Sequence, residues 1–103
     1  MKYRPLSPAA VAEALKGLPG WEFKESWLRK TFKFESFREA IQFVNRVADV
    51  AEQVVHHPDI YVRQENVVLI LQTHQAHHQV TEFDIDLARR IDAMQSARGM
   101  DAL

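Results

Sequence analysis

One stretch near the middle of the chain constrains the fold most. Residues 52–74 read EQVVHHPDIYVRQENVVLILQTH. Proline disfavours helical backbone at the residue before it, so a helix entering this stretch must end near His56-His57. The alternating residues that follow predict a β-hairpin, with Glu65-Asn66 as its two-residue turn because Asn tolerates positive φ. The chain must therefore change here from a helix to antiparallel strands.

The position of that turn decides which residues face each other across the hairpin. The predicted turn pairs Gln64 with Val67 and, when the ladder is extended, places His57 opposite His74. Opposed positions on neighbouring strands have Cβ atoms roughly 5 Å apart. We therefore expect both imidazoles to reach one small ligand.

The two faces of the hairpin differ in character. One face is apolar and predicts the core side, whereas the other is polar with two apolar residues and could meet a ligand or a partner subunit. The predicted core face holds Ile60, Val62, Val67, Leu69 and Leu71, and the other holds Asp59, Tyr61, Arg63, Val68, Ile70, Gln72 and His74.

Patterns on either side of the hairpin predict the remaining elements. Ser36 with Glu39, and Thr81 with Asp84, have the spacing of helix-capping pairs. We expect helices at residues 8–18, 37–54 and 82–95, strands at 21–23 and 27–34, and fraying from Ser96 to the end. The order αββαββα predicts one α+β domain over residues 1–103, a four-stranded antiparallel sheet with helices packed on one face.

Composition excludes several classes of function. The chain has 103 residues, a net charge of −1 and no cysteine, so we expect no direct nucleic-acid binding, no disulfide and no thiol chemistry. It has no run of 18 apolar residues and no apolar segment of the signal-peptide type near its beginning. We therefore expect a cytoplasmic protein that does not enter a membrane.

The histidines are the compositional anomaly, because all five lie between residues 56 and 78. A histidine near a helix end often caps carbonyl groups or stays half exposed. An unperturbed imidazole has a pKa of about 6.5, which suits proton transfer near neutral pH. A third possibility is a metal site from His74, His77 and His78 with Glu52 or Asp84. The residue pattern alone leaves these three explanations open.

Several short motifs taken together resemble one family over nearly the whole chain, the pterin-4a-carbinolamine dehydratases. They are Ala51-Glu52, His56-His57-Pro58, Thr73-His74, Asp84 within TEFD, and the segments LKGLPGW at 15–21 and TFKF at 31–34. The resemblance implies dehydration of a 4a-hydroxytetrahydropterin to a quinonoid dihydropterin, in the recycling of tetrahydrobiopterin. It implies a pterin substrate and no metal or organic cofactor.

The resemblance also implies roles for individual residues. His56 and His74 match the family's acid/base pair, and His57 matches a histidine that holds substrate. Glu52 and Asp84 match acidic positions near the site, where we expect them to orient imidazoles or to favour the imidazolium. A further match is Trp21, at a family tryptophan near the pterin.

At two positions the chain departs from the family pattern. The family usually has Tyr or Trp where this chain has Gln64, which we expect to alter packing. It usually has a glycine-containing turn after Thr-His, where this chain has residues 77–80 (HHQV) and one extra residue. The altered loop could reshape the mouth of the site or remove activity on pterins.

The resemblance implies partners as well as chemistry. The family forms tetramers as dimers of dimers, so we expect a homodimer or homotetramer. Some animal members also serve as dimerisation cofactors for a homeodomain transcription factor, and relatives without the histidines have assembly roles. A non-catalytic dimerisation or assembly cofactor is therefore the alternative to an enzyme.

Overall fold

The computed structural model describes residues 3–101, with side chains described up to Ala97. The expected domain limits, residues 1 and 103, lie outside the described residues. The predicted order αββαββα is confirmed, with one short 3₁₀ helix in addition. The elements are α1 (Pro8–Leu15), β1 (Glu22–Lys24), β2 (Trp27–Lys33), α2 (Phe37–Val54), β3 (Asp59–Arg63), β4 (Asn66–Leu71), η1 (His74–Ala76) and α3 (Glu82–Asp101).

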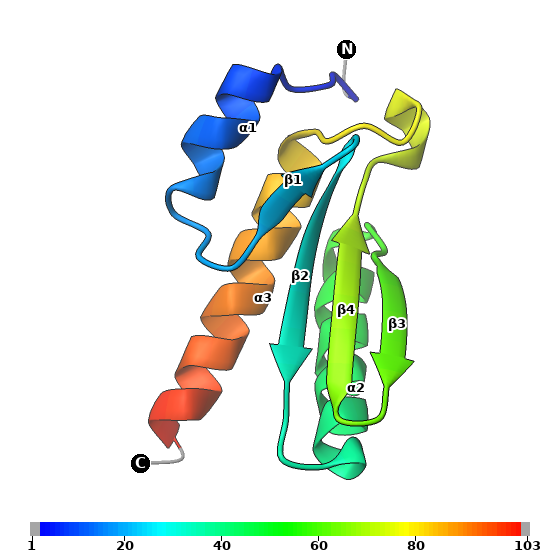
Figure 1. Ribbon diagram of the computed structural model, residues 1–103. Coiled ribbons are helices and arrows are strands. Elements are labelled where there is room, and N and C mark those ends of the chain that lie inside the picture. The colour runs from blue at the N-terminus through cyan, green and yellow to red at the C-terminus, as the bar shows by residue number, and fades with distance from the viewer. Residues whose placement is uncertain (1–2, 102–103) are drawn as a thin grey trace.

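The four strands form one antiparallel sheet in the order β1-β2-β4-β3. Helices α2 and α3 lie on one face of this sheet, and α1 lies beside β1 at the edge away from β3 (Figure 1). The predicted α+β architecture is therefore confirmed. The helices described here include none that is both long and apolar enough to cross a membrane. The core lies between the sheet and the helices and includes Leu28, Phe32, Phe43, Val67, Leu69, Leu71, Leu87 and Ile91.

Helix α2 begins where its capping residues predict. The Ser36 side chain accepts a hydrogen bond from the Glu39 amide at 3.1 Å, which satisfies one of the free N–H groups of the first turn. The buried stripe of this helix does not include Phe37, whose side chain is 60% exposed. The buried positions are Ala40, Phe43, Val47 and Ala51, at the spacing of one helical face.

The turn of the β3–β4 hairpin lies one residue earlier than predicted. The last pair is Arg63 with Asn66, so the turn residues are Gln64 and Glu65, and Gln64 takes the positive φ of 56°. Asn66 also pairs with Lys33 of β2. Because β4 is held by strands on both sides, Asn66 stays in the sheet although its local preference favours the turn.

This change in register alters which residue lies opposite His57, but each side chain stays on its predicted face of the hairpin. Asp59 pairs with Ile70, so extending the ladder brings His57 opposite Gln72 and not opposite His74. The offset is two residues, and side chains alternate with a period of two, so every residue keeps its predicted face. Val67, Leu69 and Leu71 are fully buried, as predicted for the core face.

Helices α1 and α3 and strand β1 begin or end at other residues than predicted. Helix α1 stops at Leu15, three residues early, because the chain goes into successive turns in which the Leu18 amide donates to Leu15 O and the Trp21 amide to Leu18 O. Strand β1 begins one residue later than predicted. Helix α3 continues to Asp101, so the fraying expected from Ser96 is not seen up to that residue.

Candidate active site

The candidate site lies at the end of the sheet where α2 finishes, β3 starts, β4 finishes and α3 begins (Figure 1). Its first component is an unusual backbone turn at the end of α2. Val55 has φ 53° and ψ 46°, the left-handed conformation that glycine usually supplies at this point of a helix. The His56 amide donates to Ala51 O at 3.1 Å and the Val55 amide to Glu52 O at 3.4 Å. The turn fixes where the chain leaves the helix and so where His56 lies.

The side chain of His56 bonds to a fully buried carboxylate from another element. Its Nε2 lies 2.6 Å from Oδ1 of Asp84, whose side chain is 0% exposed. The other carboxylate oxygen accepts hydrogen bonds from the Thr73 hydroxyl at 2.7 Å and the Thr81 amide at 2.9 Å. The bond from the Thr81 amide confirms the predicted cap at the start of α3. Asp84 therefore joins α2, the end of β4 and α3 at one point.

These hydrogen bonds determine which groups donate and which accept in the network. An ionised carboxylate can only accept, so Thr73 gives its single hydroxyl hydrogen to Asp84. Thr81, whose hydroxyl oxygen is 2.6 Å from that of Thr73, must then be the donor between the two hydroxyls. By the same reasoning His56 carries its hydrogen on Nε2, which leaves Nδ1 without a hydrogen in the neutral ring. Asp84 thus orients the His56 ring through Nε2, and Nδ1 is left as a nitrogen that can accept a proton.

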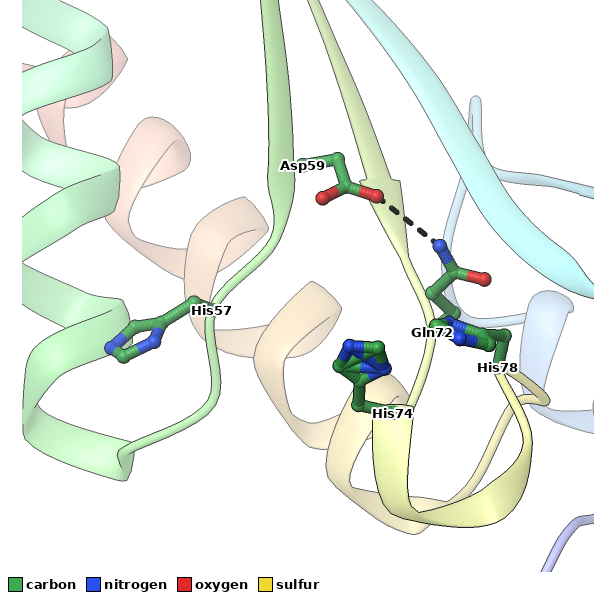
Figure 2. Close-up of a pocket in the computed structure, with 5 residues that line it drawn as sticks. All are labelled: His57, Asp59, Gln72, His74 and His78. Atoms are coloured by element: carbon green, nitrogen blue, oxygen red, sulfur yellow. Dashed lines mark hydrogen bonds between the residues drawn. The ribbon is translucent and has the colours of Figure 1, made fainter.

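A hollow of about 150 Å³ lies at the same end of the sheet, and Figure 2 shows the side chains that line it. It combines imidazoles with a carboxylate and an amide, and Gln72 Nε2 donates to Asp59 Oδ2 at 3.2 Å. One carboxylate oxygen of Asp59 is therefore engaged within the wall, while the amide keeps its carbonyl oxygen for another donor. The lining residues are His57, Asp59, Gln72, His74 and His78.

A second hollow, of about 240 Å³, shares part of this lining. His57, Gln72 and His74 border both hollows, and the second adds His56. It is completed by Val55 and Gln75. The structure thus brings the three histidines that the motifs identify to a surface depression made of these two hollows, which share three lining residues.

The two acidic residues expected near the imidazoles serve different histidines. Asp84 contacts His56, as described above. Glu52 Oε2 lies 3.7 Å from Nε2 of His57, and the two side chains are 76% and 60% exposed. Because both side chains are so exposed to solvent, Glu52 holds His57 only weakly. Asp84 is therefore the acid that orients an imidazole, and Glu52 adds negative charge near His57.

The structure does not bring Trp21 to either hollow. Its side chain is 5% exposed and packs edge-on against Phe32 with ring centroids 6.1 Å apart. The indole N–H donates to both carboxylate oxygens of Asp92, each at 3.1 Å. Within one copy of the chain, Trp21 belongs to the core between the sheet and α3.

The metal site considered from the sequence is not assembled. Within residues 3–101, no three His, Asp or Glu side chains are grouped so that they could hold a metal ion. His74 and His78 do come together, with ring centroids 4.2 Å apart, whereas His77 borders neither hollow. Asp84 belongs to the network around His56, Glu52 pairs with His57, and the three histidines lie in the segment after β4.

Sequence reasoning missed four residues of the site. Asp59 and Gln72 were assigned to the face that carries His74, and that alternation was the signal that could have placed them in the lining. Thr73 was noted only as the neighbour of His74, although its hydroxyl bonds to Asp84. His78 was considered only as a metal ligand, and no periodic signal placed it in the lining, because it lies in a loop whose path depends on contacts with other segments.

Comparisons with known proteins point to one family. The sequence model of a family described as pterin 4 alpha carbinolamine dehydratase matches residues 4–94. A protein of Thermomicrobium roseum, named provisionally as such a dehydratase, is 47% identical over 91 residues, which cover 88% of this chain and 97% of the relative. A provisionally named dehydratase of Nocardia farcinica is 45% identical over 89 residues, covering 86% of this chain and 93% of the relative.

Solved structures extend the comparison to the fold. A Brucella melitensis protein described as a transcriptional coactivator/pterin dehydratase superposes with a TM-score of 0.81 at 34% identity, covering 87% of this chain and 97% of that one. A pterin dehydratase-like protein identified as a RuBisCO assembly factor in the alpha-carboxysome gives a TM-score of 0.58 at 26% identity, covering 71% and 83%. With motif, fold and relatives in agreement, the chain belongs to the pterin-4-alpha-carbinolamine dehydratase family.

Proposed function

We propose that this chain, as a single domain over residues 1–103, dehydrates 4a-hydroxytetrahydropterins to quinonoid dihydropterins. The reaction is that of a hydro-lyase and would serve the recycling of tetrahydrobiopterin in the cytoplasm. His56 and His74 are the proposed acid/base pair, and His57 is proposed to hold the substrate. The chemistry needs no metal and no organic cofactor.

The reaction requires two proton transfers on neighbouring atoms. The bond between ring carbon 4a and the hydroxyl oxygen breaks as that oxygen takes a proton and leaves as water. The adjacent ring nitrogen loses its proton, and its electron pair completes the carbon–nitrogen double bond. One imidazolium and one neutral imidazole supply these steps, and each returns to its starting state by proton exchange with water.

The observation that carries the proposal is the bond between His56 and the buried Asp84 beside a depression that His74 also borders. A carboxylate with 0% exposure is costly to bury unless its hydrogen bonds are satisfied. Here they are satisfied by the imidazole and by groups of Thr73 and Thr81. The bond to Asp84 holds the His56 ring in one orientation beside the depression, which is what an acid/base residue needs.

The lining of the depression suits a flat, polar heterocycle. Pterins carry ring N–H groups, an amino group and a carbonyl, all of which need partners. Asp59 can accept from such donors, and Gln72 offers a carbonyl oxygen. His57 lies on the opposite side of the hollow from His78 (Figure 2), so an aromatic ring is available at both sides of a bound ligand. Trp21 stays a proposed contact that would need a second copy of the chain or a larger ligand.

Replacing each member of the acid/base pair tests the proposal. His56→Ala and His74→Ala should each lower kcat by about 10²–10⁴-fold, the usual contribution of a positioned acid or base. His57→Ala should act mainly on KM, because its proposed task is to hold substrate. Turnover is followed as loss of the carbinolamine, with the uncatalysed reaction subtracted. Unchanged kcat in both alanine variants of the pair would refute their roles.

A binding role on the same fold is the second candidate. The observation in its favour is the likeness to the protein identified as a RuBisCO assembly factor. In that case the chain would act through a surface, and the alanine variants of His56 and His74 would keep its function in the cell. The retained network around His56 favours the enzyme, since a scaffold has no need of a carboxylate–imidazole pair beside an open depression.

We also propose that the chain forms a homodimer or homotetramer. Strand β3 lies at the edge of the sheet, and Tyr61 and Val62 on it are 55% and 37% exposed. An exposed edge strand with apolar residues can pair with another copy across a two-fold axis. Light scattering at assay concentration should give the mass of two or four chains, and the mass of one chain would contradict the proposal.

A further inference from the structure

His74 has less support than its proposed partner in proton transfer. His56 is held by Asp84 at 2.6 Å. Within residues 3–101 the side chain of His74 makes no hydrogen bond, and its ring packs against that of His78 with centroids 4.2 Å apart and planes at 54°. A group that transfers a proton must be held in reach of the reacting atom. The contact with His78 is therefore the feature that can restrict the His74 ring.

The backbone of the loop is held in a strained form that directs His78 to this contact. His77 and His78 have φ values of 56° and 61°, in the left-handed region that few residues other than glycine adopt. The His78 amide donates to Thr73 O at 3.0 Å, and its carbonyl accepts from the Ser26 hydroxyl at 3.1 Å. Two strained residues in succession persist only where the surroundings determine them, and such positions concentrate at functional sites.

The neighbouring histidine shows that the strain alone does not explain His78. His77 has a similar positive φ and is also exposed, yet it borders neither hollow. His78 borders the hollow of about 150 Å³ together with His57 and His74. Figure 2 shows the rings of His74 and His78 side by side, at the two ends of the short segment that joins them. Two adjacent residues with similar positive φ values thus differ in their relation to the site.

We propose that His78 is a positioning residue for His74 in the dehydration reaction. Its ring limits the rotation of the His74 ring and forms the wall of the hollow behind it, and it exchanges no proton with the substrate. This inference rests on the proposed function, and it assigns to the loop after Thr73-His74 a part in catalysis. The loop, which departs from the family pattern, supports the activity and does not remove it.

The pair of adjacent histidines supplies a matched test. His78→Ala should lower kcat about threefold to tenfold, the range expected for one aromatic ring contact, with little change in KM. His77→Ala removes a histidine in the same backbone conformation and should leave kcat at the wild-type value. His78→Phe keeps a ring but cannot carry a proton, so it should restore most of the lost kcat. Thermal unfolding of the three variants shows whether the loop substitutions disturb the fold equally.

A second measurement does not depend on turnover. NMR couplings that report the χ1 angle of His74 should show one rotamer in wild type and in His77→Ala, and averaging over several rotamers in His78→Ala. Equal kcat and equal couplings in the two alanine variants would overturn the inference. If the wild-type protein does not dehydrate carbinolamines, the proposed function fails, and unchanged His74 couplings in His78→Ala would separately refute the positioning contact.

Discussion

Replacement of Asp84 separates its two tasks, as the cap of α3 and as the partner of His56. In the folded protein one oxygen serves His56 and the other serves the Thr73 hydroxyl and the Thr81 amide. Asp84→Ala removes all three bonds and leaves the two threonine donors without this acceptor. Asp84→Asn keeps one carbonyl oxygen, which can still accept from both threonines, and presents an amino group to His56.

The expected free energies of unfolding differ between these variants. A buried donor left unsatisfied costs about 1–3 kcal/mol, so Asp84→Ala should lower the free energy of unfolding by about 2–6 kcal/mol. That is a large fraction of the roughly 5–15 kcal/mol of a typical domain. Asp84→Asn exchanges one charge-assisted bond for a neutral one and should cost about 1 kcal/mol. Urea unfolding measures both values.

The asparagine variant should lose activity although it keeps most of its stability. The amino group of Asn can only donate to Nε2 of His56, so the ring must move its hydrogen to Nδ1 and loses the anion that stabilises its protonated form. Asp84→Asn should therefore stay folded and lose about 10²–10⁴-fold in kcat. The control is Asp86→Asn, whose carboxylate bonds to Arg90 at 2.8 Å on the exposed side of α3, and which should keep both stability and kcat. Wild-type kcat in Asp84→Asn would show that Asp84 is a helix cap alone and would refute the reasoning.

Two further substitutions test the surroundings of the site. Val55 is 79% exposed in a left-handed conformation, so Val55→Gly should relieve about 1–2 kcal/mol of strain. Glycine also makes the unfolded chain more flexible, which lowers the free energy of unfolding by about 0.5–1 kcal/mol. We therefore expect a net rise in melting temperature of a few degrees. A fall in melting temperature would show that Val55 is not strained. Glu52→Gln breaks the exposed pair with His57 and should change the free energy of unfolding by less than about 1 kcal/mol while raising KM slightly. A loss of kcat as large as that of His56→Ala would instead make Glu52 a direct participant.

Local patterns in the sequence predicted most of the fold because they describe interactions between near neighbours. The caps at Ser36 and Thr81 depend on spacings of three residues, and both are formed. The faces of the β3–β4 hairpin follow from alternation, which survives a register error of two residues. The order of elements and the placing of helices on one face then follow from which surfaces are apolar.

The hairpin turn shows where local preference fails. Asn66 is the better candidate for positive φ, and on local grounds it belongs in the turn. The structure keeps it between Lys33 and Arg63 in the sheet, and Gln64 takes the left-handed conformation instead. Pairing with a strand more than thirty residues away outweighed the preference of one residue, and no window of sequence contains that information.

The site was predictable in part for a related reason. The motifs identified His56, His57 and His74, and the resemblance placed Asp84 near them. The bond of Asp84 to His56, rather than to His57 or His74, depends on how α3 packs beside the end of α2 and has no signature in spacing. The contact of His78 depends on two strained residues and on Ser26 from another turn, so it could be seen only in three dimensions.

The rate of carbinolamine dehydration with and without wild-type protein tests the central claim most directly. The carbinolamine is generated in place, and its decay is followed at increasing protein concentration in the same buffer. We predict a first-order rate that rises in proportion to protein and is lost to the background level when His56→Ala replaces wild type. A wild-type rate equal to that of buffer alone would contradict the account.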